Sequence, residues 1–87
     1  MIHEITTTAA PADVLSRAKT FFATRVPNNA AFPDKEGPGY LVLRGQGGEE
    51  LVIAARAADG GTMVRGSTML FDQQVKRFFS TLPGVAA

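Results

Sequence analysis

The chain has 87 residues, of which 45% are apolar and 20% charged, with nine basic side chains against eight acidic ones and no cysteine. This length and this ordinary globular composition predict a single folded domain over residues 1–87. The net charge of +1 lacks the basic excess on which sequence-independent nucleic-acid binding depends, so nucleic acid is a disfavoured partner. Without cysteine, disulfides, thiol nucleophiles and thiolate metal sites are excluded.

Residues 1–6 hold neither the basic region nor the apolar stretch of a secretory signal. The apolar runs are far shorter than the roughly 20 residues that a membrane-spanning helix needs. We therefore expect a cytoplasmic protein that makes no membrane contact. A domain of this size buries only roughly 63% of the surface of its unfolded chain, so a partner chain that covers further apolar surface would add stability.

Residues 2–8 are rich in β-branched side chains and predict an opening strand that ends near Thr8. Pro11 then suits the first position of a helix, where its missing N–H costs nothing. Apolar side chains recur from there along one helical stripe, namely Val14, Leu15, Ala18, Phe21, Phe22 and Val26. The helix is expected to end before Pro27, because proline disfavours helical geometry in the residue that precedes it.

Residues 27–39 carry three prolines, two glycines and two asparagines. This composition predicts a connection, although thirteen residues is long for so small a domain. Two interpretations are open, a mobile flap or an irregular wrap held in place by Phe32. A short strand around Ala30–Phe32 is a further alternative.

Three strands are predicted next, within residues 39–45, 49–57 and 62–70. Asp59 and Gly60 predict a two-residue hairpin turn with positive φ at both positions. Residues 45–48 (Gly-Gln-Gly-Gly) predict the other turn. A phosphate-binding loop is disfavoured there, because such loops lead into a helix and this segment leads into a strand.

The two hairpins set the strand register and so divide the side chains between two faces, with Ala54 opposite Arg65 and Val42 opposite Val52. The face expected to lie under the helices holds Leu41, Leu43, Leu51, Ile53, Ala55, Val64, Thr68 and Leu70. The second face is mixed and holds Tyr40, Val42, Arg44, Glu50, Val52, Ala54, Arg56, Met63, Arg65 and Ser67.

A second amphipathic helix is predicted by the apolar stripe of Phe71, Val75, Phe78, Phe79 and Leu82. It is expected to end at residues 82–84 (Leu-Pro-Gly). The predicted fold class is therefore α+β, in the order β-α-β-β-β-α. It consists of a mostly antiparallel sheet of about four strands with two helices packed on one face.

No catalytic or metal-binding pattern is recognisable. His3 is the only histidine, and acid–base catalysis would need a second positioned group that no neighbouring sequence supplies, so we interpret it as a surface or edge residue. Ser67 and Ser80 lack the context of a nucleophile elbow. The acidic residues match neither a calcium loop nor a metal-chelating helix. We predict no catalytic residue, no metal and no cofactor, and an enzyme is the least favoured class.

Residues 9–15 (Ala-Ala-Pro-Ala-Asp-Val-Leu) follow the opening strand, and residues 62–70 (Thr-Met-Val-Arg-Gly-Ser-Thr-Met-Leu) run directly into residues 71–82 (Phe-Asp-Gln-Gln-Val-Lys-Arg-Phe-Phe-Ser-Thr-Leu). With this order of elements, the chain resembles a reduced form of the START-like helix-grip superfamily, which includes polyketide cyclase-like and lipid-transfer proteins. The resemblance implies an apolar ligand cavity, which a sheet of about four strands would need a second chain to complete. Its expected lining is apolar and consists of Phe21, Phe22, Leu41, Ile53, Val64, Phe78 and Phe79.

The mixed sheet face leaves three interpretations open. The favoured one is a homodimer that covers its apolar strip, in a non-enzymatic module with a small apolar ligand as a further partner. The second is an ordinary solvent-exposed face. The third is a nucleic-acid or anion site, because a basic sheet surface with an aromatic residue suits both stacking and phosphate contacts. The residues of the interface or anion site would be Tyr40, Arg44, Arg56, Met63 and Arg65.

Overall fold

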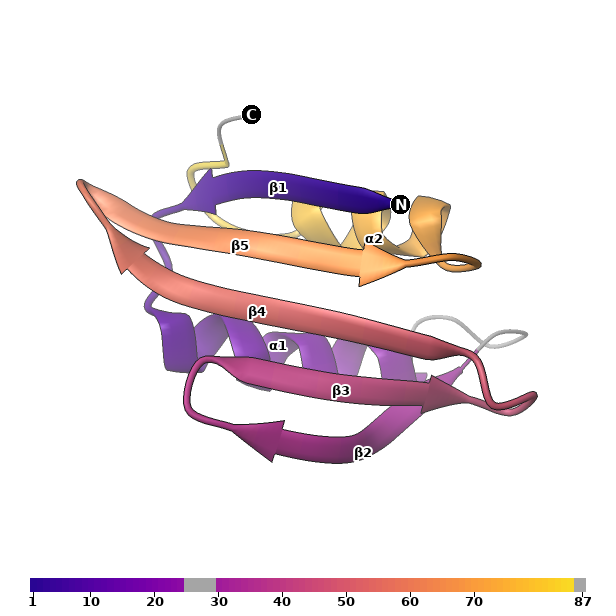
Figure 1. The fold of residues 1–87 in the computed structure, drawn as a ribbon. Coiled ribbons are helices and arrows are strands. Elements are labelled where there is room, and N and C mark those ends of the chain that lie inside the picture. Colours follow the sequence, from indigo (N-terminus) through magenta and orange to yellow (C-terminus); the bar gives the residue numbers. More distant parts are fainter. Residues whose placement is uncertain (25–29, 86–87) are drawn as a thin grey trace.

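The computed structural model describes residues 1–24 and 30–85. Its elements are β1 (Ile2–Thr7), α1 (Pro11–Thr24), β2 (Ala31–Gly37), β3 (Tyr40–Gly45), β4 (Glu50–Ala58), β5 (Gly61–Thr68) and α2 (Asp72–Ser80). The strands form one antiparallel sheet in the order β1-β5-β4-β3-β2. Both helices lie behind the sheet in Figure 1, so one face is covered and the other is open. The predicted α+β class with two helices on one face is confirmed.

Helix α1 begins at Pro11, as expected, and Arg17 pairs with Asp13 one turn earlier, with 2.9 Å between Nε and Oδ2. The apolar stripe faces the sheet, and Leu15 packs at its margin. Its fully buried members are Val14, Ala18, Phe21 and Phe22. The helix ends at Thr24 in the described part of the chain, while Val26 and the predicted stop at Pro27 lie outside it.

The predicted connection over residues 27–39 is wrong for most of its length, because Ala31–Gly37 forms the edge strand β2. The alternative of a short strand around Ala30–Phe32 is correct in part, since the strand begins at Ala31 but extends five residues beyond Phe32. The strand exists through its antiparallel pairing with β3, and the register slips between Pro33 and Lys35. An edge position tolerates both Pro33 and this bulge, since an edge strand needs hydrogen bonds on one side only. Phe32 does not hold a wrap in place, because it is 50% exposed. Residues 27–29 lie outside the described structure. The sheet therefore has five strands where about four were predicted, and the element order is β-α-β-β-β-β-α instead of the predicted β-α-β-β-β-α.

The predicted register of the two central hairpins is confirmed, with Ala54 opposite Arg65 and Val42 opposite Val52. The Asp59–Gly60 turn also forms, but only Gly60 has a positive φ, of 77°, so the predicted positive φ at Asp59 is wrong. The turn over residues 45–48 leads into β4, as expected, and is closed by a 2.8 Å hydrogen bond from the Gly45 N–H to the Glu49 carbonyl.

Leu70 was expected on the covered face and is instead 68% exposed. The reason is the side chain of Thr68, whose hydroxyl accepts hydrogen bonds from the Leu70 N–H (3.2 Å) and the Phe71 N–H (2.9 Å). These bonds turn the chain out of the sheet directly after β5. The strand alternation stops there, so Phe71 enters the core and Leu70 does not.

The core lies between the covered face of the sheet and the two helices. Phe21, Phe22 and Phe78 form its centre, with ring centroids 5.1 to 5.6 Å apart. Aromatic pairs in this range of distances contribute energy beyond the area that they bury. The remaining covered-face residues of the prediction are buried and are Leu41, Leu43, Leu51, Ile53, Ala55, Val64 and Thr68. None of the helices in residues 1–24 and 30–85 is long and apolar enough to cross a membrane.

Gly66 allows α2 to approach the sheet closely. A Cβ at this position would lie 2.7 Å from Cγ1 of Val75 and 3.5 Å from the Phe79 ring. We expect Gly66→Ala to destabilise the fold by about 1–3 kcal/mol, because the helix must shift to relieve the overlap. Urea denaturation measures this change, and Ser67→Ala, on the other face of the same strand, is the control. An unfolding midpoint equal to that of the wild type would contradict the close packing of α2.

Candidate functional site

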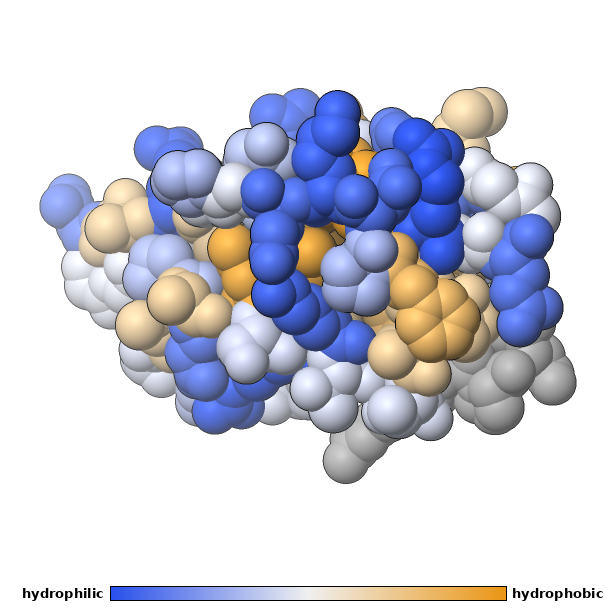
Figure 2. Space-filling model, turned by 90° about the horizontal axis from the view of Figure 1, so that it is seen from below, coloured by the Kyte–Doolittle hydropathy of each residue, from blue (hydrophilic) through white to orange (hydrophobic). Residues whose placement is uncertain are grey.

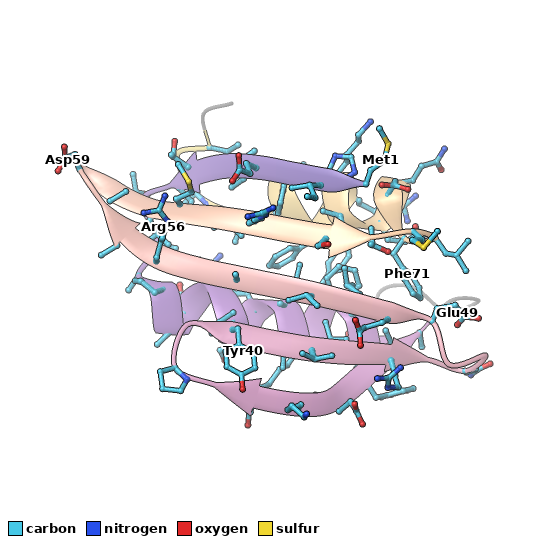
Figure 3. The ribbon with its side chains drawn as sticks, viewed as in Figure 1. Met1, Tyr40, Glu49, Arg56, Asp59 and Phe71 are labelled. Atoms are coloured by element: carbon cyan, nitrogen blue, oxygen red, sulfur yellow. The ribbon has the colours of Figure 1, made fainter. Side chains whose placement is uncertain are left out.

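The open face of the sheet is the largest feature that the two-layer fold leaves uncovered. The register places its outward side chains in rows that run across the strands, as Figure 3 shows for the whole sheet. One row holds Ile2, Ser67, Val52 and Val42, each opposite the next. We call these four residues the apolar row. Directly opposed side chains on antiparallel strands lie about 4.5–5.5 Å apart at Cβ, so Val52 and Val42 form a continuous apolar strip.

A second group occupies the end of the open face towards the Asp59–Gly60 turn. Arg56 and Met63 are opposite each other, Arg65 is opposite Ala54, and Ala54 is opposite Tyr40. We call Tyr40, Arg56, Met63 and Arg65 the basic end. Figure 3 shows Tyr40 and Arg56 on this part of the sheet. A hollow of about 370 Å³ lies here, and its lining includes both arginines and Met63.

The two arginines of the basic end are free to act on a partner. Arg56 Nη2 lies 3.4 Å from the sulfur of Met63, a weak acceptor. Across the described ranges 1–24 and 30–85, neither Arg56 nor Arg65 forms a salt bridge. Glu4 is opposite Arg65 on β1 and lines the same hollow without forming a salt bridge with it, and Asp59 lies at the adjoining turn, so the two guanidinium groups share this end with two carboxylates.

Arg44, which was grouped with these residues, lies elsewhere. It is opposite Glu50, and six residues of β4, or about 20 Å, separate Glu50 from Arg56. Its guanidinium is held by two carboxylates, with Nε 3.1 Å from Asp34 Oδ2 and Nη2 3.1 Å from Glu50 Oε2. The structure therefore brings Tyr40, Arg56, Met63 and Arg65 together and leaves Arg44 at the opposite end.

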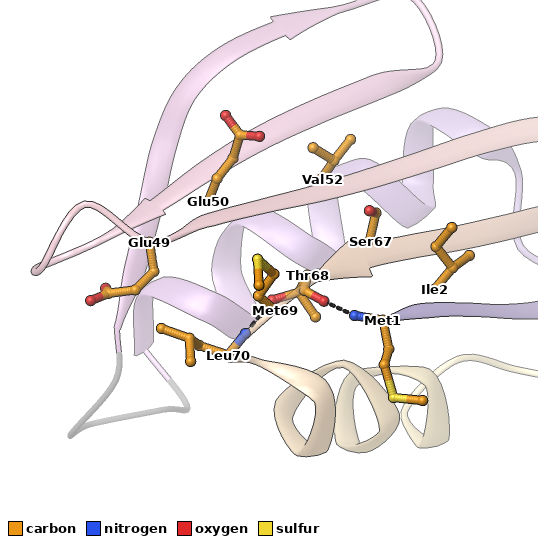
Figure 4. Close-up of a pocket in the computed structure, with 9 residues that line it drawn as sticks. All are labelled: Met1, Ile2, Glu49, Glu50, Val52, Ser67, Thr68, Met69 and Leu70. Carbon is orange, nitrogen blue, oxygen red and sulfur yellow. Dashed lines mark hydrogen bonds between the residues drawn. The ribbon is translucent and has the colours of Figure 1, made fainter.

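That opposite end combines acidic side chains with a hollow whose lining is largely apolar. Glu49, Glu50 and Asp34 outnumber Arg44, so an excess of negative charge remains. We call the group of Glu49, Glu50 and Met69 the acidic end. A second hollow of about 370 Å³ lies there, and Figure 4 shows the residues that line it. Its apolar lining is Met1, Ile2, Val52, Met69 and Leu70.

The edge formed by β2 limits the open face on one side. Figure 2, which looks onto this edge, shows hydrophilic side chains lying across apolar surface. Lys35 is opposite Val42, and the neighbouring Glu36 pairs with Lys19 of α1. Tyr40 lies against Gly37, where a Cβ would come within 2.5 Å of its ring. These charges and the bulge make β2 a poor edge for pairing with another strand.

The seven residues predicted to line a cavity are all part of one buried cluster between the sheet and the helices. Their aromatic members pack ring against ring, with Phe78 and Phe79 at a centroid distance of 6.2 Å. One further hollow, of about 400 Å³, touches this cluster at Phe21 and is otherwise lined by Ser16, Arg17, Thr20 and Thr81. The role of the cluster as a ligand lining stays a prediction.

Sequence reasoning missed the partner of His3. Its Nε2 lies 2.7 Å from Oδ1 of Asp72, the first residue of α2, and its side chain is 15% exposed. The amino terminus lies 3.6 Å from the same oxygen. The hydrogen bond from His3 is the largest of the causes that hold the pKa of Asp72 below its ordinary value of 3.8, while burial acts in the opposite direction. No local signal pairs residues 3 and 72, because they meet only when β1 joins β5.

The His3–Asp72 pair ties β1 to the start of α2. No group of three or more histidine, aspartate and glutamate side chains that could hold a metal ion lies in the part of the chain that the structure describes. The candidate site is therefore a surface with an apolar row between a basic and an acidic end. Such an arrangement is suited to binding another surface.

Comparison with protein-family profiles, curated proteins and solved structures found no match for this chain.

Asp72→Asn tests the link between β1 and α2. A lowered pKa in the folded state means that the ionised Asp72 stabilises the fold above pH 3.8, and that this contribution is lost as the pH falls through the lowered pKa. We expect the variant to unfold at a lower urea concentration than the wild type at neutral pH, with the difference closing as the pH falls below the lowered pKa of Asp72. A difference in unfolding midpoint that is the same at neutral pH and in acid would contradict a stabilising role for the ionised Asp72.

Proposed function

We propose that this chain is a non-enzymatic module that acts as a homodimer, in which the open faces of two copies pack against each other. The observation that carries the proposal is the apolar row, which crosses four strands on a sheet face that neither helix covers. Its apolar surface continues into Met69, which is 87% exposed, and Leu70. Ser67 separates Ile2 from the two valines within the row, and exposed apolar surface on a small protein suits an interaction site.

The extent of the open face fits a small interface. Five strands about 4.8 Å apart and roughly 20 Å long give a flat area of about 500 Å², to which the relief of the side chains adds. A standard interface buries roughly 800 Å² per partner. Two sheets packed in this way place their backbones about 10 Å apart.

The proposal includes a small apolar ligand. Two copies that pack by their open faces would close the hollow lined by Met1, Ile2, Val52, Met69 and Leu70, which is too open in one copy to exclude water. The resemblance to a reduced helix-grip protein supports the same idea, because the enclosing surface that a short sheet lacks would come from the second chain.

Val52→Asp tests the homodimer at the centre of the apolar row. A carboxylate there would have to lose its water in the interface, so we expect the variant to sediment as a monomer at concentrations where the wild type is dimeric. Sedimentation velocity over a range of concentrations measures this, and circular dichroism checks the fold. Ser16→Asp, on the exposed side of α1, is the matched control and should leave the dimer intact. A wild type that is monomeric throughout would refute the proposal.

A second candidate function is anion binding at the basic end. The observation that favours it is the pair Arg56 and Arg65, which line one hollow and form no salt bridge within residues 1–24 and 30–85. They are diagonal neighbours on adjacent strands, at a Cβ separation of about 7–8 Å, which suits the binding of one anion between two guanidinium groups.

Calorimetric titration with inorganic phosphate at low salt tests this candidate, and a short single-stranded oligonucleotide tests the nucleic-acid form of it. We expect the double variant Arg56→Gln/Arg65→Gln to lose the heat of binding. The control variant Lys76→Gln/Arg77→Gln removes the same amount of charge from exposed positions on α2 and should keep the heat of binding. Absence of binding by the wild type to either ligand would exclude the candidate.

A further inference from the structure

We infer that the two open faces of the dimer meet with their strands antiparallel, about a two-fold axis that runs across the strands, so that Arg56 of each copy lies against Glu50 of the other. This arrangement rests on the proposed homodimer and specifies how the two copies are oriented. It follows from the distribution of charge along one strand, β4, together with the register of its neighbours.

Two side chains of opposite charge, Glu50 and Arg56, lie towards the two ends of β4. Arg56 lies near the end of β4, in the hollow that it shares with Arg65. Glu50 begins the same strand and is 54% exposed, although its Oε2 already accepts a hydrogen bond from Arg44. A carboxylate accepts several hydrogen bonds, so Glu50 can bind a second guanidinium in addition to Arg44.

When two stacked sheets keep their strands aligned, the two-fold axis between them runs either along the strands or across them. An axis along the strands, above β4, would place Arg56 on the partner's Arg56 and Glu50 on the partner's Glu50. An axis across the strands would exchange the two ends and place Arg56 on the partner's Glu50 twice. Like charges that face each other in an interface are costly, and opposite charges fix its register, so the second arrangement is favoured.

The register of the sheet shows which residues such an axis would bring together. His3, Gly66, Ile53 and Leu41 lie opposite one another in one row across four strands, at the level midway between Glu50 and Arg56 of β4. A two-fold axis above this row places Val52 on the partner's Ala54. The apolar centre therefore meets a small side chain, which leaves room for close packing between two valine-bearing surfaces.

Charge reversal in two separate copies tests the orientation. In a dimer of Arg56→Glu, two acidic side chains should face each other at positions 50 and 56. In a dimer of Glu50→Lys, two basic side chains should face each other there. We expect each variant to dimerise at least roughly tenfold more weakly than the wild type at low salt. An equimolar mixture should form a heterodimer with nearly wild-type affinity, because each reversed residue then meets its opposite charge. Arg77→Glu, on the exposed side of α2, is the matched control and should not change the affinity.

Sedimentation velocity of the single variants and of their mixture distinguishes the outcomes. If the mixture of Arg56→Glu with Glu50→Lys dimerises with nearly wild-type affinity, the axis across the strands is supported. If instead the mixture of Arg56→Glu with the wild type does so, that axis is overturned in favour of the axis along the strands. If the wild type dimerises and neither mixture regains wild-type affinity, the orientation is wrong while the homodimer stands. A monomeric wild type would remove the homodimer itself, and circular dichroism of each variant separates loss of folding from loss of association.

Discussion

The packing of α1 and α2 against each other on one side of the sheet is the constraint on which the rest of the structure depends. Phe21 and Phe22 of α1 contact Phe78 of α2, with ring centroids within 5.6 Å. These rings must be buried together, so both helices lie on the same face. Gly66 lets α2 approach the sheet, and the covered face supplies aliphatic side chains beneath both helices. The opposite face of all five strands is consequently left without a layer of its own.

The open face does not have the composition of a purely solvent-exposed surface. Two half-buried valines lie side by side on β3 and β4. Arg56 and Arg65, which form no salt bridge within the described residues, lie apart from the carboxylates of Glu49 and Glu50. In an isolated domain the two charged ends serve no packing purpose, and an apolar strip between them costs solubility. In a dimer of open faces the strip is buried and the ends neutralise each other. One arrangement of two copies thus accounts for both features.

Much of the fold could be predicted from the sequence because it depends on local patterns. The helical stripe from Val14 to Phe22 and the stripe from Val75 to Phe79 each repeat at helical spacing, and the tight turn at Gly60 sets the strand register. The start of strand β2 was predicted only as an alternative, and its extension to Gly37 could not be recognised in this way. Its only apolar residue with strand preference is Phe32, and its conformation comes from pairing with β3 across a bulge.

The site was only partly predictable for similar reasons. The side chains of the open face were assigned to that face correctly on each strand. How they divide between its two ends depends on distances along the strands, and these distances separate Arg44 from Arg56. The exposure of Leu70 depends on a hydroxyl of Thr68 that redirects the chain. His3 finds Asp72 only because β1 is placed beside β5, at the far side of the sheet from β2. Each of these outcomes depends on tertiary structure.

The most direct measurement is an isotope-filtered nuclear Overhauser experiment on a mixture of labelled and unlabelled copies, which detects only contacts between different chains. If open faces pack as proposed, cross-chain signals should connect the methyl groups of Val52 with the methyl group of Ala54. Cross-chain signals confined to the exposed sides of the helices, or no cross-chain signal at concentrations well above those used for sedimentation, would contradict the packing of two open faces.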